Sequence, residues 1–355
     1  MTAAAVNAAM TAAVVRIRRL CEQPESERVL RAEVLREIRA VVPFDFYVWV
    51  GTDPVTRVGA TPLAEVPSPA DLPLVIRLKY ATAALRWTGL PADRVLTLAG
   101  WRGPEPGDRP AADLPWRDLL NGYGVHDVAS VVLRDRFGCW GFIDLWRSAT
   151  GPAFTPAEQG FLAGLLPILT RAVRRSVGAT FHRGAPATAG PAVLLLAESL
   201  APQSFTPQAD VRLRALLPTP PEHSPVPAIA LNVAAQLLAV EGGVDDRPAM
   251  TRGYAGGRWL IVRAARLGPA GGPARDIVVT LEDATTADRL EVYRRAIGLT
   301  ARETDVLGRL VDGADTRSTA RALGIVEVTV NDHLKSIFAK SGTNSRRELI
   351  ARLTG

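Results

Sequence analysis

The sequence predicts three consecutive domains: two of the mixed α+β or α/β class with antiparallel sheets, then one all-α domain of four helices. Two pairs of apolar segments joined by short turn-forming loops predict antiparallel hairpins, at 128–134 with 140–146 and at 259–267 with 276–282. Residues 299–354 contain helix caps and helix breaks at short intervals, which predicts a compact helical domain. The expected domains cover 1–178, 191–284 and 294–355, with linkers over 179–190 and 285–293.

Composition and charge narrow the class of protein. The chain has 355 residues, of which 47% are hydrophobic, and this is enough for two or three buried cores. A formal net charge of +6 fits a nucleic-acid partner. No apolar run is long enough to span a bilayer, and the N-terminus lacks the features of a signal peptide. The two cysteines, Cys21 and Cys139, give no disulfide framework. We therefore expect a cytoplasmic protein with no membrane partner.

The order of elements can be predicted in both of the first two domains. In the first, we expect helices over 2–20 and 25–41, a strand over 44–50, the 128–146 hairpin and a closing helix. That last helix begins at Pro156, because Thr155 is a good N-cap and proline suits the first helical position. In the second domain we expect a strand over 192–196, helices over 209–217 and 229–240, and the closing hairpin.

The C-terminal domain contains the most informative pattern. Thr300 and Glu303 form a capping box, so the first helix should begin at Ala301. Asp315 can cap a second helix that ends before Gly324, where a tight turn leads to the third helix. A further capping box, Ser345 with Glu348, is expected to open the fourth helix. A helix, a short glycine-containing turn and a second helix make a helix-turn-helix unit.

The third helix has an apolar side and a polar side. Helical spacing directs four residues into a small core: Val330, Leu334, Ile337 and Phe338. The opposite side has Val328, Asp332, Lys335 and Ala339, with Asn331 on its flank. Amide, carboxylate and ammonium groups can pair with base edges in the major groove. Arg317, Lys340, Arg346 and Arg347 are candidate phosphate contacts around this helix. The alternative is an ordinary amphipathic bundle with a solvated charged face.

This stretch resembles the LuxR-type (NarL/FixJ-type) helix-turn-helix domain of bacterial transcription regulators. The resemblance covers about 294–353 and rests on Leu299-Thr-Ala-Arg-Glu, Leu323-Gly-Ile, Thr329-Val-Asn-Asp-His-Leu and Phe338-Ala-Lys-Ser-Gly. It implies that Asn331, Asp332 and Lys335 face bases, and that Thr329, His333 and Lys340 lie near the DNA backbone or buttress the helix. It also implies that the fourth helix serves a dimer contact. The sequence departs from the family pattern at Val326, where a capping Ser is usual, and at Thr319 and Ser341.

The first two domains resemble sensor domains. The strand pattern with Gly141-Phe-Ile-Asp-Leu-Trp-Arg resembles a GAF-like domain preceded by helices, and the second domain resembles a PAS-like domain. Such folds hold small molecules between sheet and helices. The segment 75–88 is the best pocket candidate, since an anionic or aromatic ligand would suit its polar and aromatic residues: Arg77, Lys79, Tyr80, Arg86, Trp87 and Thr88. The alternative is an amphipathic helix with a solvated basic face.

We therefore predict a transcriptional regulator whose operator binding is controlled by a signal sensed in the N-terminal domains. The predicted partners are double-stranded DNA, a small-molecule effector, a second copy of the chain in a homodimer, and RNA polymerase. A regulator switched by a partner protein is the main alternative. A third hypothesis is a catalytic GAF-like domain that uses Cys139 with His126 and Asp144. We rank it below the two preceding functions. No cofactor and no metal site is predicted, because the histidines lack metal-ligand spacing.

Overall fold

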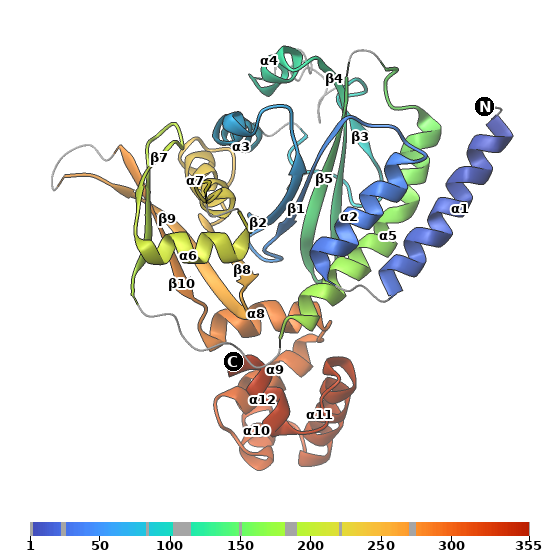
Figure 1. Ribbon diagram of the computed structural model, residues 1–355. Helices are drawn as coiled ribbons and strands as arrows, with labels where there is room; N and C mark the ends of the chain where they lie inside the picture. The colour runs from blue at the N-terminus through green and yellow to red at the C-terminus, as the bar shows by residue number, and fades with distance from the viewer. Residues whose placement is uncertain are drawn as a thin grey trace.

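Two antiparallel sheets lie next to each other, and a helical module lies below them in the computed structural model (Figure 1). The structure describes residues 3–22, 26–82, 85–101, 115–148, 151–181, 190–219, 222–269 and 275–354. Helix α1 begins at the N-terminal end, on the outer side of the first sheet (Figure 1).

The first domain is one five-stranded sheet between two layers of helices. Its strand order is β2-β1-β5-β4-β3, and all pairs are antiparallel. Helices α1, α2 and α5 pack on one face, while α3 and α4 pack on the other. Because both faces are covered, β4 and β5 are apolar almost throughout. The elements are α1 (Ala3–Glu22), α2 (Glu27–Arg39), β1 (Phe46–Thr52), β2 (Gly59–Glu65), η1 (Pro69–Asp71), α3 (Leu72–Ala81), β3 (Leu96–Thr97), α4 (Pro115–Gly122), β4 (Val125–Asp135), β5 (Gly138–Ser148) and α5 (Pro156–Ala179).

The second domain repeats this strand order in a second sheet, β7-β6-β10-β9-β8. Its helix α7 is buried at every position from Ala228 to Gln236. A helix that is apolar on all sides needs cover on all sides. Here the domain's own strands cover one side, and α3 and β2 of the first domain cover the other. The elements are β6 (Ala192–Leu196), β7 (Pro202–Phe205), α6 (Pro207–Leu216), α7 (Ala228–Glu241), β8 (Met250–Ala255), β9 (Arg258–Leu267) and β10 (Asp276–Asp283).

The helical module ends the chain, and its caps are mostly those that the sequence predicts. The Thr300–Glu303 capping box forms, Asp315 accepts from the Ser318 amide at 2.7 Å, and Gly324 has a φ of 65° at the turn. The Ser345 box forms only in half, since the Glu348 carboxylate accepts from the amide of Asn344 instead of Ser345. The helices are α8 (Thr286–Ala296), α9 (Ala301–Val311), α10 (Thr316–Leu323), α11 (Glu327–Ser341) and α12 (Arg346–Thr354).

The predicted fold class is confirmed: two antiparallel sheets with helices precede an all-α module. Both predicted hairpins form, β4 with β5 and β9 with β10. The stretch 285–293, expected as a linker, is helical and forms most of α8. Most of the other expected linker, 182–189, lies outside the described residues. Among the described helices, none is both long and apolar enough to cross a membrane.

Candidate functional site

Helix α11 has one side in the core of the module and the other side open. Its buried side packs in the core that α9, α10 and α12 share, through Val330, Leu334 and Ile337. Since an α-helix has 3.6 residues per turn, residues at 328, 332 and 335 align on the opposite side. We call this exposed side the reading face; it consists of Val328, Asn331, Asp332 and Lys335.

Two predicted base-reading residues pair with each other. Lys335 Nζ lies 3.1 Å from Asp332 Oδ1, and both side chains are exposed. An exposed ion pair of this kind contributes little to stability. It can therefore open at small cost when a base edge offers either side chain a better partner.

Lys340, which was predicted to lie near the DNA backbone, forms an ion pair with Glu303 of the same module. Its Nζ lies 2.6 Å from Glu303 Oε2, and Ser336 Oγ donates to Glu303 Oε1 at 2.6 Å. Burial raises the pKa of Glu303, but hydrogen bonds from Lys340, Ser336 and Thr300 outweigh burial and lower the pKa to about 2. Glu303 thus joins the start of α9 to the end of α11. This contact supports the buttressing role among the two that the family resemblance implies for Lys340.

The other predicted contacts to the DNA backbone differ in exposure and in their partners. Arg317 and Arg347 are exposed, and Thr329 and His333 are half-buried. Arg346 donates to Thr316 Oγ1 at the start of α10. Positive and hydrogen-bonding side chains of this kind can contact a DNA backbone, which positions a protein without reading sequence. That these residues do so stays a prediction.

The start of α11 lacks a side-chain cap. Val326 stands at the N-cap position and makes no side-chain hydrogen bond to the first turn. Helices α9 and α10 each have such a bond, from Thr300 and Asp315. Val326 and Val328, on either side of Glu327, are both exposed. The first turn of α11 therefore presents an apolar surface.

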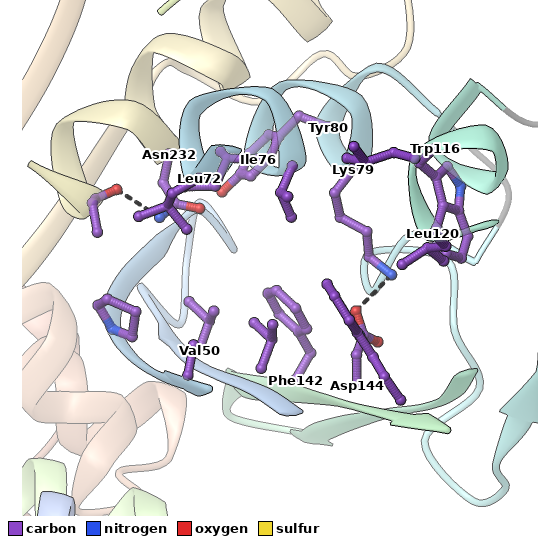
Figure 2. A pocket seen from close by; sticks show the side chains of 17 residues that line it. Val50, Leu72, Ile76, Lys79, Tyr80, Trp116, Leu120, Phe142, Asp144 and Asn232 are labelled. Atoms are coloured by element: carbon purple, nitrogen blue, oxygen red, sulfur yellow. Dashed lines mark hydrogen bonds and ion pairs between the residues drawn. The ribbon is translucent and has the colours of Figure 1, made fainter. Parts of the chain in front are cut away.

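A cavity of about 70 Å³ lies between the first sheet and its helices α3 and α4. That volume gives room for about five water-sized groups. Figure 2 shows Leu72, Ile76 and Tyr80 of α3 on one side, with Val50 and Phe142 of the sheet facing them. Ala228 and Asn232 of α7 also line the cavity, so the second domain supplies part of the wall. The site is enclosed mainly by apolar and aromatic groups.

One ion pair crosses this cavity. Lys79 reaches from α3 to Asp144 of β5, with Nζ 2.9 Å from Oδ2, and both side chains are largely buried (Figure 2). Ser130 Oγ donates to the other oxygen of Asp144 at 2.6 Å. The Lys79 ammonium also lies 5.1 Å from the Trp116 ring. The sequence offers one hint of this site, because Asp144 interrupts an otherwise apolar strand.

The predicted ligand residues divide between this cavity and other contacts. Lys79 and Tyr80 line the cavity, and the Tyr80 hydroxyl accepts from the Gly59 amide at 3.0 Å. The remaining four make other contacts. Arg77 is exposed, and Trp87 stacks on Phe142. The Thr88 carbonyl accepts hydrogen bonds from Arg57 and Arg134, and Arg86 forms an ion pair with the second domain. Arg77 lies on the exposed side of α3, whereas Arg86, Trp87 and Thr88 lie beyond the end of that helix at Ala81, although the prediction treated 75–88 as one segment.

Arg86 belongs to the contact between the two sheet domains. Its Nη2 lies 2.8 Å from Asp245 Oδ2 and 2.7 Å from Gln236 Oε1, and the ion pair is 2% exposed on both sides. A second buried pair joins Arg252 of β8 to Asp53, which follows β1, at 2.8 Å. Breaking either buried pair would leave a charge without its partner, so these contacts favour one arrangement of the two domains.

Cys139 has the surroundings of a structural cysteine. It is fully buried in β5, its Sγ lies 3.6 Å from Thr52 Oγ1, and burial raises the pKa of the thiol. A nucleophile needs the thiolate and an open approach, so these surroundings argue against catalysis at Cys139. Within the described ranges, His, Cys, Asp and Glu side chains form no group of three or more that could hold a metal ion.

The module meets the sheet domains through aromatic rings. Phe181 stacks on Trp259 of β9 with ring centroids 4.9 Å apart, and its other neighbour is Tyr293 of α8, also at 4.9 Å. Arg295 Nη1 donates to the Phe137 carbonyl at the tip of the β4–β5 hairpin, at 2.8 Å. The module is therefore attached to both sheet domains.

Sequence comparison gives two matches, and the first lies on this module. Residues 298–353 match the family model described as "Bacterial regulatory proteins, luxR family". A monoamine regulon transcriptional regulator of Klebsiella aerogenes is 43% identical over 54 residues, which are 15% of this chain and 24% of that protein. The matched part is thus about a quarter of the length of this relative. The family match includes α11 and its reading face.

Three solved structures are distantly similar to the chain. Escherichia coli SdiA has 11% identity and a TM-score of 0.34, over 94% of each chain. Vibrio cholerae VqmA has 21% identity and a TM-score of 0.20, over 46% of this chain and 81% of that one. The bacteriophytochrome RpBphP3 of R. palustris has 14% identity and a TM-score of 0.30, over 80% and 63%.

Proposed function

We propose that this chain, whose C-terminal module is a LuxR-type DNA-binding domain, is a transcriptional regulator that a small molecule controls. The module binds double-stranded DNA by placing the reading face of α11 in the major groove. One observation supports this most. The residues that match the family, 298–353, include an exposed face of amide, carboxylate and ammonium groups.

The effector site in this proposal is the cavity under α3. Apolar walls with a few convergent polar groups are typical of small-molecule sites. The cavity suits a small apolar or aromatic molecule with a polar end directed at Lys79 and Asp144. Because Lys79 and Asp144 neutralise each other, an uncharged end with one donor and one acceptor can hydrogen-bond to the intact pair without burying a new charge.

The regulator acts as a homodimer on paired half-sites in this proposal, since helix-turn-helix proteins usually read two half-sites. Ala228 and Asn232 join the cavity wall to α7. An effector that moves α3 therefore also moves the second domain, whose strand β9 contacts Phe181 and, through it, Tyr293 of α8. This is a continuous chain of contacts from cavity to module.

The DNA part of the proposal can be tested by selection. The full chain is mixed with a pool of random duplexes, and the bound DNA is recovered and sequenced. We expect a two-part sequence to be enriched, and Asn331→Ala and Lys335→Ala to relax it at single positions by about 1–3 kcal/mol. Equal losses of affinity on selected and random DNA would assign these side chains to phosphates instead.

The effector part needs a variant that fills the cavity. Ile76→Trp places a larger side chain in it, while Leu74→Trp, on the exposed side of the same helix, is the matched control. We expect native mass spectrometry to detect a bound small molecule in the wild type and Leu74→Trp, and not in Ile76→Trp. A wild-type chain that binds nothing small but captures a protein would favour the partner-switched alternative.

A further inference from the structure

Two valines at the start of α11 are unusually exposed for large apolar side chains. Val326 is 67% exposed and Val328 is 68% exposed, the highest values among such residues in the described part of the chain. The other large side chains of α11 follow the expected division, with aliphatic residues inside and polar ones outside. Val328 departs from that division on the reading face, the surface that faces DNA in the proposed function, and Val326 precedes the helix at its N-cap position.

The position of Val328 places it in line with the predicted base readers. Val328, Asp332 and Lys335 are spaced i, i+4 and i+7, so they follow one side of the helix. Four residues advance about 6 Å along a helix, which corresponds to about two base-pair steps. The N-terminal residues of a recognition helix are also those that contact base edges. Val328 therefore lies one turn from Asp332 on the same reading face.

An apolar side chain can read one feature of the major groove. A branched aliphatic group has no hydrogen bond to offer, but it can contact the 5-methyl group that thymine alone among the four bases presents. We propose that Val328 contacts a thymine methyl group and thereby sets the base preference about two base pairs from the pair that Asp332 contacts. The inference rests on the proposed DNA-binding function and adds a specificity-determining residue to it.

A protein partner is a poorer occupant of this surface. Apolar patches that bind proteins extend over several hundred Å², whereas two valines cover only a small part of that area. Their neighbours on the reading face are the charged Asp332 and Lys335, both exposed. A narrow apolar strip beside hydrogen-bonding groups matches a base edge, where methyl groups and polar atoms alternate.

The experiment starts from the duplex that the full chain selects from a random pool. Each thymine of that duplex is replaced singly by deoxyuridine, which removes the methyl group and keeps the hydrogen-bonding pattern. We expect one replacement per half-site to weaken wild-type binding about fourfold, as expected for one buried methyl group. With Val328→Ala, the same replacement should cost nothing measurable.

Two variants show that the effect belongs to this contact. Val328→Thr keeps the branched shape with one methyl group and should retain part of the deoxyuridine effect. Val211→Ala, an equally simple truncation of an exposed valine on α6, should behave as the wild type does. If Val328→Ala keeps the full fourfold effect, or if no thymine is sensitive in the wild type, the inference is wrong while the proposed function stands. Failure to enrich any sequence would overturn the proposed function, and this inference with it.

Discussion

The junction between the two sheet domains is held mainly by buried ion pairs. The junction between those domains and the C-terminal module is held mainly by aromatic rings, with one longer ion pair beside them, from Arg252 to Asp288 at 3.5 Å. At the first junction, Arg86 pairs with Asp245 and Arg252 pairs with Asp53, each at 2.8 Å. At the second, Phe181 packs between Trp259 and Tyr293. Apolar contact is non-directional, while a buried ion pair fails as soon as its geometry is lost.

This difference assigns different mechanical roles to the two junctions. The sheet domains share α7 as a common core element, and separating them would expose its apolar faces and break two buried ion pairs. We therefore expect them to behave as one unit. The module has its own helix caps, and its core meets the sheet domains through non-directional apolar contacts at Phe181 and Trp259, so we expect it to change position without unfolding. A regulator needs such a rigid part and such a movable part.

The largest predicted effect tests the rigid junction. Arg86→Met removes one partner of a buried ion pair and leaves Asp245 with only Arg247, whose side chain is more exposed. Breaking a buried ion pair costs about 3–5 kcal/mol. Because Arg247 and two backbone amides still hold Asp245, we expect the lower end, a fall of about 3 kcal/mol in the free energy of unfolding in urea. Both sheet domains should still unfold in a single transition, because they share one core.

The matched control for this change is Arg94→Met. Arg94 also pairs with an aspartate, Asp93, but both side chains are mostly exposed. Exposed pairs of this type contribute little, so the variant should lose less than about 0.5 kcal/mol. Two separate transitions in Arg86→Met, or losses of similar size in both variants, would contradict a charged junction that joins the domains.

The second prediction concerns the module alone and its dependence on pH. The pKa of Glu303 is about 2 in the folded chain, below its ordinary value of about 4.3. A lowered folded pKa stabilises the module above the ordinary value, and this stability is lost as the pH falls from about 4.5 to 2. We expect a loss of about 2 kcal/mol over this range, measured by hydrogen exchange of peptides from 300–341 in the full chain.

Glu303→Gln separates this effect from general acid unfolding. The variant should be less stable at pH 6 and should lack the extra loss between pH 4.5 and 2. Glu327→Gln changes an exposed glutamate in the first turn of α11, and it should keep the wild-type pH profile. A wild-type profile in Glu303→Gln would show that the contact with Lys340 does not hold α9 to α11.

The sequence predicted the local features of the sheet domains and of the helical module well. Thr300, Thr155 and Asp315 cap helices as expected, because a cap depends on residues within one turn. Both hairpins form as predicted, since each joins neighbouring segments. The residues Asn331, Asp332 and Lys335 are exposed together because the apolar residues of α11 determine which side is buried. Their contacts with bases stay a prediction.

The features that the sequence did not predict depend on distant residues. Strand β2 includes Pro62 and Gly59 and has little strand character of its own, so it forms through its pairing with β1. Arg86 is 159 residues from its partner Asp245, and no local pattern connects them. For the same reason, the contribution of Asn232 to the cavity wall could not be predicted, since it depends on how α7 packs against α3.

The smallest predicted effect tests the movable junction. Arg295→Met removes the hydrogen bond to the Phe137 carbonyl, which fastens α8 to the tip of the first domain's hairpin. Because Arg295 is partly exposed and also pairs with Glu291, we expect a loss of stability of only about 1 kcal/mol. Affinity for the selected duplex should instead rise by up to about fivefold, the equivalent of that energy, because the module is released to meet DNA.

Arg263→Met is the appropriate comparison, since Arg263 pairs with Glu282 on the exposed side of the second sheet, away from the module. Stability and DNA affinity, measured by urea unfolding and by titration of a labelled duplex, should both stay near the wild type in this variant. A fall in the DNA affinity of Arg295→Met would mean that the contact holds the module in its DNA-competent position. The aromatic junction would then be as fixed as the charged one, and the two would no longer have different roles.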